Sequence, residues 1–321
     1  MDTSSRLLAD IGGTNARFAW QARPGAPIED VATLPCAGYA GLDDALADIL
    51  QRLGRPAPRR CAIAIANPVL GDLVRMTNHH WAFSISAVQA RFCFAQLKVL
   101  NDFTALALAL PALEPAELRP LGGGCALPAA PMGLIGPGTG LGVSALLPDG
   151  RGGHVAVAGE GGHVTLPACT PREQQVLAQL AERHGHVSAE RAVCGQGLVD
   201  LHAALCALDA PGGPPPALTA ADVTAAALAR SDARCVEALE MFCAFLGTVA
   251  GNLALTLGAR GGVYLGGGIV PRLGAFIDGS PFRERFEAKG RFRGYLAAIP
   301  VFVINSRQSP ALRSAARALD A

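Results

Sequence analysis

The sequence predicts an α/β protein built from two related domains. Strand-like and helix-like segments alternate along the first hundred residues, a pattern typical of layered α/β folds. A strand–glycine loop–strand unit occurs twice, at residues 7–20 and 133–147. The chain has 321 residues, about twice the length of a typical domain. Together these observations indicate a duplicated domain rather than one large one.

The elements of the N-terminal half follow from apolar periodicity. Residues 7–11 and 16–20 predict the two strands of a hairpin, and residues 42–53 place their apolar side chains on one face of a helix. Two more buried strands are expected at 61–66 and 97–100, and a helix at 103–110.

A domain boundary is expected near residue 111, where Pro111, Pro115 and Pro120 precede the run Gly122-Gly123-Gly124. The C-terminal half then reads as a second sheet and its helices. We expect a surface connection at 211–216, a long helix over 222–259, a strand with a third glycine turn over 261–269, a strand at 300–304 and a closing helix at 309–319.

Composition excludes several classes of protein. The chain has 27 basic and 26 acidic residues and a net charge of +1, which gives no basic patch for nucleic acid or a membrane surface. Residues 241–259 are apolar and uncharged, but Gly247 and Asn252 interrupt them, so a buried helix is expected there rather than a membrane span. The N-terminus shows no leader pattern.

The nine cysteines are scattered without a Cys-x-x-Cys or Cys-x-Cys pair. This spacing indicates neither a zinc site nor a disulfide framework. Reduced thiols in a cytoplasm are the expected state.

Both glycine loops have the composition of a phosphate-binding turn. Gly12-Gly13-Thr14 and Gly138-Thr139-Gly140 lack bulky side chains, so their backbone N–H groups can approach phosphate oxygens. One such loop is also a common hairpin connector, but two equivalent loops could hold one polyphosphate. The pair therefore predicts a nucleotide-dependent phosphotransferase.

Two acidic positions follow predicted strands. Asp10 could hold hydrated Mg²⁺ beside a nucleotide, or could simply bond the backbone of its turn. Asn101 and Asp102 precede a helix, where capping is the ordinary explanation. The functional alternative makes Asp102 a general base for a hydroxyl group and Asn101 an amide that orients the neighbouring hydroxyl.

A third group of polar residues lies on a glycine-rich segment. Glu160 and His163 are three residues apart, and a carboxylate with an imidazole suits vicinal hydroxyl groups. A metal site would need more ligands, and a His163 without a ligand is an equal alternative. Glu190 alone resembles an acidic residue in the first turn of a solvated helix.

Several ordered blocks together resemble the bacterial glucokinase family, of the ATP-dependent, non-repressor type. The blocks begin at Asp10-Ile11-Gly12-Gly13-Thr14-Asn15-Ala16-Arg17 and Met76-Thr77-Asn78-His79 with Trp81-Ala82-Phe83, followed by Asn101-Asp102-Phe103-Thr104-Ala105. They continue with Gly136-Pro137-Gly138-Thr139-Gly140-Leu141-Gly142, Gly159-Glu160-Gly161-Gly162-His163 and Ser188-Ala189-Glu190-Arg191. The last are Gly266-Gly267-Gly268-Ile269-Val270-Pro271-Arg272 and Lys289-Gly290-Arg291-Phe292. Their order and spacing make the resemblance specific over nearly the whole chain.

The resemblance implies two ribonuclease-H-like domains of the actin-like ATPase and hexokinase type around an interdomain cleft. A small domain, residues 1–110 completed by a C-terminal helix in 301–321, would face a large domain, residues 111–300. The implied reaction is ATP-dependent phosphorylation of D-glucose to glucose 6-phosphate, the first step of glycolysis, by a cytoplasmic homodimer.

The same resemblance assigns roles to single residues. It implies that glucose is bound by Asn101, Asp102, Glu160, His163 and Glu190, with Asp102 as the base on the 6-hydroxyl. It implies that ATP is bound by Asp10, Gly12, Gly13, Thr14, Gly138, Thr139, Gly140, Gly266, Gly267 and Gly268, with Asp10 holding Mg²⁺ through water. The alternatives are a kinase of another hexose, a sugar-binding sensor without turnover, and an actin-like ATPase that ignores sugars.

Overall fold

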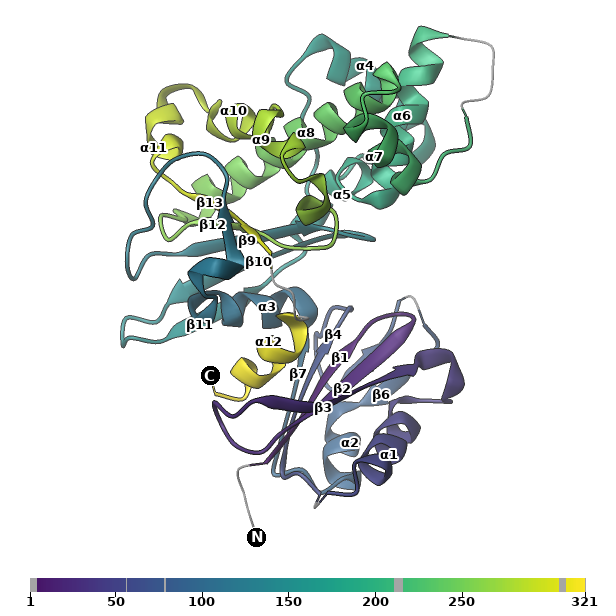
Figure 1. The fold of residues 1–321 in the computed structure, drawn as a ribbon, viewed down its shortest axis with the longest axis vertical. Coiled ribbons are helices and arrows are strands. Elements are labelled where there is room, and N and C mark those ends of the chain that lie inside the picture. Colours follow the sequence, from purple (N-terminus) through teal and green to yellow (C-terminus); the bar gives the residue numbers. More distant parts are fainter. Residues whose placement is uncertain (1–4, 56, 78, 211–215, 306–309, 321) are drawn as a thin grey trace. The chain divides into compact units, whose positions relative to one another are not determined.

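The computed structural model describes residues 5–320 except 56, 78, 211–215 and 306–309. The chain divides into two compact units, each described here by itself (Figure 1). The first unit contains Met1–Leu113, Asp149–Ala158 and Ser306–Ala321, and the second contains Glu114–Pro148 and Gly159–Asn305.

The first unit is organised by a mixed five-stranded sheet with the strand order β3-β2-β1-β4-β7. β1 pairs antiparallel with β2 and parallel with β4, and β4 pairs parallel with β7. The predicted hairpin and both predicted buried strands are therefore confirmed. The strands are β1 (Arg6–Ile11), β2 (Asn15–Gln21), β3 (Ile28–Pro35), β4 (Arg60–Ile65) and β7 (Gln96–Asn101), with the short antiparallel pair β5 (Leu73–Arg75) and β6 (Ala82–Ser84) beside them in sequence.

Helices cover both faces of this sheet, because alternate side chains of a strand point to opposite faces. Leu7 and Ile11 of β1 lie in a core with Leu46 of α1 and Val88 of α2, whereas Leu8 belongs to a separate core on α12. The helices of this unit are α1 (Leu42–Leu53), α2 (Ile85–Arg91), α3 (Asp102–Ala109) and α12 (Pro310–Ala318), and β11 (His154–Ala158) packs near α3.

The C-terminal helix α12 is fixed to β1 by a buried cation. The side chain of Arg6 is fully buried and donates to Asp320 Oδ1 at 2.5 Å and to the carbonyl oxygen of Ala316 at 3.3 Å. Because an unpaired buried guanidinium would be costly, these bonds specify where the helix docks. The end of the chain thus belongs to the same unit as its beginning.

The second unit repeats the strand plan of the first. Its strands pair in the order β10-β9-β12-β13-β8, with β9 antiparallel to β10 and parallel to β12, and β12 parallel to β13. In both units a hairpin that ends in a Gly-Thr loop continues into parallel strands, as a duplication predicts. The strands are β8 (Leu118–Pro120), β9 (Met132–Pro137), β10 (Leu141–Pro148), β12 (Val263–Leu265) and β13 (Val301–Ile304).

Most helices belong to this second unit and enclose its largest core. Phe242, Phe245 and Leu246 of α8 are fully buried there against α6, α7 and α10. The helices are α4 (Pro171–His184), α5 (Ala189–Ala192), α6 (Gly195–Asp209), α7 (Ala220–Leu228), α8 (Ala233–Leu257), α9 (Phe276–Gly279), α10 (Phe282–Glu287) and α11 (Arg293–Ala297). The 3₁₀ turns of the chain are η1 (Cys36–Gly38), η2 (Leu110–Ala112), η3 (Pro115–Glu117), η4 (Gly161–His163), η5 (Val270–Leu273) and η6 (Gly290–Phe292).

The single long helix expected over 222–259 is wrong, because the chain breaks between α7 and α8. Arg230 has a positive φ of 53°, which no helix accommodates, and Asp232 caps the next helix by accepting a 2.9 Å bond from the N–H of Cys235. The sequence on both sides of this break is rich in alanine, a strong helix former, so a continuous helix was predicted.

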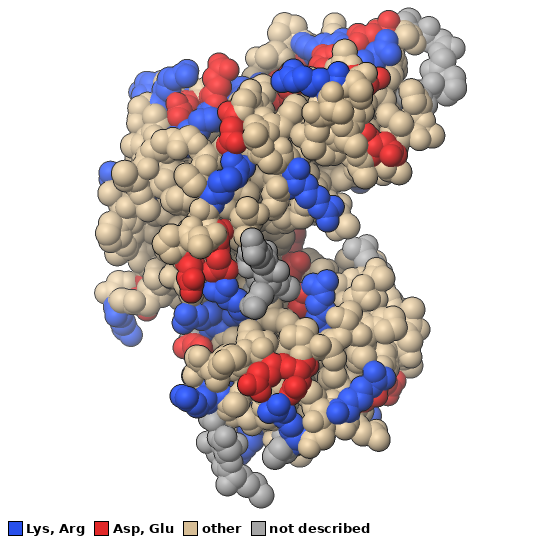
Figure 2. All heavy atoms as spheres, in the orientation of Figure 1, with Lys and Arg blue, Asp and Glu red and all other residues tan. Residues whose placement is uncertain are grey.

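One described helix, α8, is long and apolar enough to cross a membrane by length and composition. However, 78% of its most apolar window is buried inside the protein, as expected of a core helix. On the face drawn in Figure 2, acidic and basic side chains are interspersed.

Two segments do not lie in the unit that the predicted domain boundaries would give them. β13 (Val301–Ile304) belongs to the second unit, because it pairs with β12 and β8. Residues 149–158 belong to the first unit, where β11 packs near α3. The surface connection expected at 211–216 lies almost wholly outside the described residues, as does the first residue of the closing helix, Ser309.

Candidate active site

In the first unit, three parallel strands end at one edge of the sheet. The register places Ile11 of β1 beside Ile65 of β4, and Ile65 beside Asn101 of β7. The turns that follow these strands therefore lie together at the carboxyl edge, where open α/β sheets bind ligands. This geometry brings Asp10 and Asp102 to the same edge.

The first Gly-Thr loop connects β1 to β2 and is closed by its own backbone. Gly12 N–H donates to the carbonyl of Asn15 at 3.0 Å, and the carbonyl of Thr14 accepts from Cys36 N–H at 2.8 Å. The Cys36 thiol adds a bond of 3.5 Å to the carbonyl of Gly12. Gly12 therefore shapes the turn with its amide, and Gly13 and Thr14 form its tip.

Asn101 caps α3, which is the structural role that its position suggests. Its Oδ1 accepts from the N–H groups of Phe103 at 3.0 Å and Thr104 at 3.2 Å. Its side-chain amide donates to the carbonyl of Asn67 at 3.5 Å. These bonds hold the Asn101 side chain at the first turn of α3, directly before Asp102.

Burial and neighbouring charge change the acidity of Asp102. It is the first residue of α3 and is partly buried, and its Oδ1 accepts from Phe103 N–H at 2.9 Å. Burial first, and then the negative charge of Asp10, raise the pKa of Asp102 to about 6. A carboxylate with a pKa near neutrality accepts a proton more readily than an ordinary aspartate.

Asp10 fits a hydrated magnesium ion by donor type. Its carboxylate lies at the end of β1 close enough to raise the pKa of Asp102, so two hard oxygen donors share this edge. Arg17 Nη1 lies 3.6 Å from Asp10 Oδ2, with about half of the arginine side chain exposed (47%). A divalent cation would relieve the repulsion between the two carboxylates.

In the second unit, a carboxylate joins the second Gly-Thr loop. Glu190 of α5 accepts a 2.8 Å bond from the N–H of Leu141 through Oε2. A Cβ on Gly140 would lie 2.4 Å from the same oxygen, so only glycine leaves room for this contact. Glu190 is partly buried and bonded to the start of β10, so it is not a fully solvated helix-start residue.

Glu160 and His163 lie next to the same strand. Both side chains are exposed, and His163 N–H donates to the carbonyl of Glu160 at 3.0 Å to form the turn η4. A Cβ on Gly162 would lie 2.1 Å from the carbonyl oxygen of Leu141, so the turn approaches β10 closely. Glu160, His163 and Glu190 are thus gathered around the start of β10.

In the second loop Pro137 pairs with Leu141, so this loop is one residue shorter than the first, where Ile11 pairs with Ala16. Both loops are closed by the N–H of the residue that follows the strand, and in the second loop Gly138 N–H donates to the carbonyl of Gly140 at 2.8 Å. Gly195 N–H also donates to the carbonyl of Gly138 at 2.9 Å. Thr139, at the tip, is exposed.

The third glycine run lies against this second loop. Gly267 has a φ of 76°, and a Cβ there would lie 2.3 Å from the carbonyl oxygen of Pro137. Gly266 N–H donates to the carbonyl of Ile135 at 2.9 Å, whereas Gly268 has open space around its Cβ position. Two of the predicted nucleotide loops therefore lie together in this unit.

One positioning residue was missed by the sequence analysis. Asn67 is buried at the end of β4, where its Oδ1 accepts from Thr77 N–H at 2.9 Å and its carbonyl accepts from Asn101. Its signal was an Asn-Pro pair directly after a buried strand, which typically marks a turn. Asn78, from the neighbouring block, lies outside the described residues.

Comparison with known proteins supplies independent information. A family model described as Glucokinase matches residues 7–321. The glucokinase of Chromobacterium violaceum is 57% identical over 301 residues, covering 94% of this chain and 85% of that protein. The glucokinase of Aromatoleum aromaticum is 56% identical over 320 residues, covering 99% and 96%.

Solved structures resemble the chain over its full length. A glucokinase from an Antarctic psychrotroph matches with a TM-score of 0.89 and 35% identity, covering 100% of this chain and 99% of its own. The glucokinase of Balamuthia mandrillaris, solved in complex with glucose, matches with a TM-score of 0.81 and 22% identity, covering 99% and 94%. The second match shows the α/β fold alone.

Proposed function

The chain belongs to the glucokinase family, and we propose that it transfers the γ-phosphoryl group of ATP to the 6-hydroxyl of D-glucose. The products are glucose 6-phosphate and ADP, which makes the protein an ATP:hexose 6-phosphotransferase. The observation that carries the mechanism is the partly buried carboxyl of Asp102, whose pKa is raised to about 6 at the carboxyl edge of a sheet.

Asp102 acts as the general base in this proposal. Its carboxylate accepts the proton of the 6-hydroxyl as the oxygen attacks the γ-phosphorus, and the bond between that phosphorus and the β,γ-bridging oxygen breaks. The cap formed by Asn101 supports this role, because it fixes the first turn of α3, which begins with Asp102. Proximity and orientation of this kind supply much of the rate enhancement in phosphoryl transfer.

Sugar recognition is assigned to five polar residues. Asn101 and Asp102 supply an amide and a carboxylate, and Glu160, His163 and Glu190 supply two carboxylates and an imidazole. Charged acceptors and amide or imidazole donors match the vicinal hydroxyl groups of a hexose. The gathering of the last three residues around the start of β10 supports a shared ligand.

ATP is assigned to the glycine loops. Gly13 and Thr14 at one loop tip, with Gly12 shaping the turn, face the β- and γ-phosphates, as do Gly138, Thr139 and Gly140 at the other. Gly266, Gly267 and Gly268 border the adenosine. Asp10 would hold hydrated Mg²⁺, and the ion would supply positive charge to offset the negative charge that develops on the phosphoryl oxygens.

The remaining assignments follow from the family. We infer that the two units are ribonuclease-H-like domains of the actin-like ATPase type, since each contains a hairpin that continues into parallel strands. We place the enzyme in the cytoplasm, as a homodimer, at the first step of glycolysis. The small domain corresponds to residues 1–110 with the C-terminal helix of 301–321, and the large domain to 111–300. The exceptions are residues 149–158, which lie in the first unit, and β13, which lies in the second.

A hexose panel tests the proposal. ADP formation is measured with MgATP alone and with glucose, fructose, mannose or N-acetylated hexosamines, and glucose 6-phosphate is measured directly. We expect strong stimulation by glucose with equal amounts of both products. Preference for another hexose would change the substrate, and ADP release indifferent to every sugar would reject a sugar kinase.

A further inference from the structure

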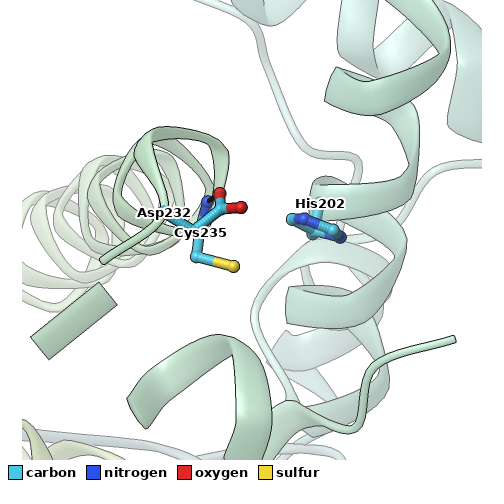
Figure 3. Close-up of side chains that lie close together, drawn as sticks. All are labelled: His202, Asp232 and Cys235. Carbon is cyan, nitrogen blue, oxygen red and sulfur yellow. Dashed lines mark hydrogen bonds between the residues drawn. The ribbon is translucent and has the colours of Figure 1, made fainter. Parts of the chain in front are cut away.

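A group of metal-ligand side chains lies far from the glycine loops in sequence, between α6 and the start of α8. Within the described ranges, His202, Asp232 and Cys235 each offer one ligand atom, and these atoms all lie within 4.8 Å of one another. Figure 3 shows the Asp232 and Cys235 side chains pointing from one helix start toward the His202 ring on the neighbouring helix.

A fourth candidate ligand, the thiol of Cys206 on α6, lies beside this group. Cys206 lies one helical turn after His202, and its Sγ is 3.6 Å from His202 Nε2. It is also close enough to Cys235 to interact with it electrostatically. The two helices therefore each contribute two donors, His202 and Cys206 from α6 and Asp232 and Cys235 from α8.

The printed distances within this group can be compared with those of a tetrahedral zinc ion. Zn–S and Zn–N bonds of about 2.3 and 2.0 Å at tetrahedral angles separate sulfur from nitrogen by about 3.5 Å. The distance of 3.6 Å between Cys206 Sγ and His202 Nε2 already matches that edge. The ligand atoms of His202, Asp232 and Cys235 lie within 4.8 Å of one another, so a contraction of at most about 1.3 Å, which side-chain rotation can supply, brings each pair to this spacing.

Burial and charge favour the same ion. His202, Cys206 and Cys235 are 2%, 7% and 1% exposed, whereas Asp232 is exposed and offers a route of entry. Two thiolates, one carboxylate and a neutral imidazole carry three negative charges, so bound Zn²⁺ leaves about one. Arg234 neighbours these residues and also lies 3.7 Å from Asp209, so it can balance the remaining charge.

We propose that His202, Cys206, Asp232 and Cys235 form a structural zinc site that ties the C-terminal half of α6 to the start of α8. Four protein ligands close the coordination shell, which is typical of structural rather than catalytic zinc. Sequence spacing hid the site, since its donors form His-x₃-Cys and Asp-x₂-Cys pairs on separate helices. The proposal is independent of the sugar kinase reaction.

Cobalt binding to the untagged full-length chain tests the proposal. Cys93, Cys125 and Cys169 are exposed, so they are replaced by Ser in the parent protein to remove competing thiols. Co²⁺ is titrated under reducing conditions, and Zn²⁺ is then added as a competitor. We expect one Co²⁺ per chain, with the intense visible bands of tetrahedral coordination and thiolate-to-metal charge transfer, both abolished by Zn²⁺.

Three variants test the proposed ligands, and a fourth serves as the control. C235S and C206S should each reduce the charge-transfer intensity and weaken Co²⁺ binding at least about tenfold. Loss of a residue that only supports a ligand already weakens metal binding about tenfold, so loss of a ligand should cost at least as much. D232N keeps the helix cap, because asparagine caps as well as aspartate, but should also bind at least about tenfold more weakly. C243S, a buried cysteine on the same helix outside the group, should behave as the parent.

Thermal unfolding provides a second measurement. Zn²⁺ should raise the Tm of the parent and of C243S, and should raise that of D232N much less at the same concentration. D232N alters an exposed side chain, so it keeps the test valid if a buried cysteine variant fails to fold. Absence of charge-transfer absorption, or binding of Co²⁺ that is unchanged in C235S and D232N, would overturn the zinc site.

Discussion

Glu190 Oε2 accepts a 2.8 Å hydrogen bond from the N–H of Leu141, the first residue of β10. The bond connects a proposed sugar ligand to the end of the second phosphate loop, and the absence of a Cβ on Gly140 makes it possible. On the proposed function, this carboxylate would have two tasks, which substitutions can separate.

Glu190→Gln should raise the KM for glucose about tenfold with little change in the KM for ATP. The amide oxygen of glutamine can still accept from Leu141, but the charged acceptor for the sugar is lost. Glu190→Ala leaves the Leu141 N–H without this partner, at a cost of about 1–3 kcal/mol, and should raise both KM values. Steady-state kinetics and urea unfolding measure these effects, and an alanine variant that retains both KM values and its stability would contradict the dual role.

Asp102→Asn should stabilise the protein near neutral pH. The folded pKa of about 6 lies above the usual value of about 3.9, so the folded state binds more protons than the unfolded one between these values. Stability contributed by this group is therefore lost as the pH rises from about 4 to about 6. The variant should gain about 1–3 kcal/mol at pH 7.5 and almost nothing at pH 4.

Urea unfolding of both proteins at the two pH values measures this difference. A gain that is equal at pH 4 and pH 7.5 would mean that ionisation of Asp102 is not its cause. A loss at pH 7.5 would show that Asp102 contributes more to capping than its burial costs.

Gly162→Ala should destabilise the second unit by about 2–3 kcal/mol. The new Cβ would lie 2.1 Å from the backbone carbonyl oxygen of Leu141, which cannot move without shifting β10. Gly159→Ala is the matched control from the same loop, because its Cβ would meet no atom within 4 Å. Urea unfolding measures the stability of both variants. Equal stabilities would show that the turn tolerates a side chain at residue 162, where it approaches β10.

Glu173→Gln should cost about 2–4 kcal/mol, because it leaves a partly buried arginine without its counter-ion. Glu173 Oε1 lies 2.5 Å from Arg285 Nη1, and their side chains are 5% and 12% exposed. The control is Glu237→Gln, which breaks the more exposed bridge to Arg172 and should cost less than about 1 kcal/mol. Similar losses of stability in both variants would contradict the idea that the buried ion pair contributes more than the exposed one.

Helices and strands whose apolar residues recur at regular spacing could be predicted from the sequence. α1 begins at Leu42 and ends at Leu53 as expected, because its apolar residues recur at helical spacing and Gly54 ends it with a φ of 57°. The break before α8 was missed, since it depends on the backbone of Arg230 in an otherwise helical composition. Periodicity cannot detect one residue with a positive φ.

The candidate site was predictable in its residues but not in its geometry. Asn101 and Asp102 could be found from their place after a strand. The raised pKa of Asp102, however, depends on burial and on the charge of Asp10, which lies 92 residues earlier in the chain. Glu190 resembled a surface residue until its bond to Leu141 was seen. Contacts of this range depend on tertiary packing, which sequence spacing does not encode.

The pH dependence of kcat/KM for glucose tests the role of Asp102 most directly. The wild-type value should fall about tenfold per pH unit below about pH 6, as the carboxylate becomes protonated. Asp102→Asn should be lower by about 10²–10⁴-fold at pH 7.5 and should lack this limb of the profile. A wild-type profile that stays flat through pH 6, or an asparagine variant with near-normal turnover, would contradict Asp102 as the base.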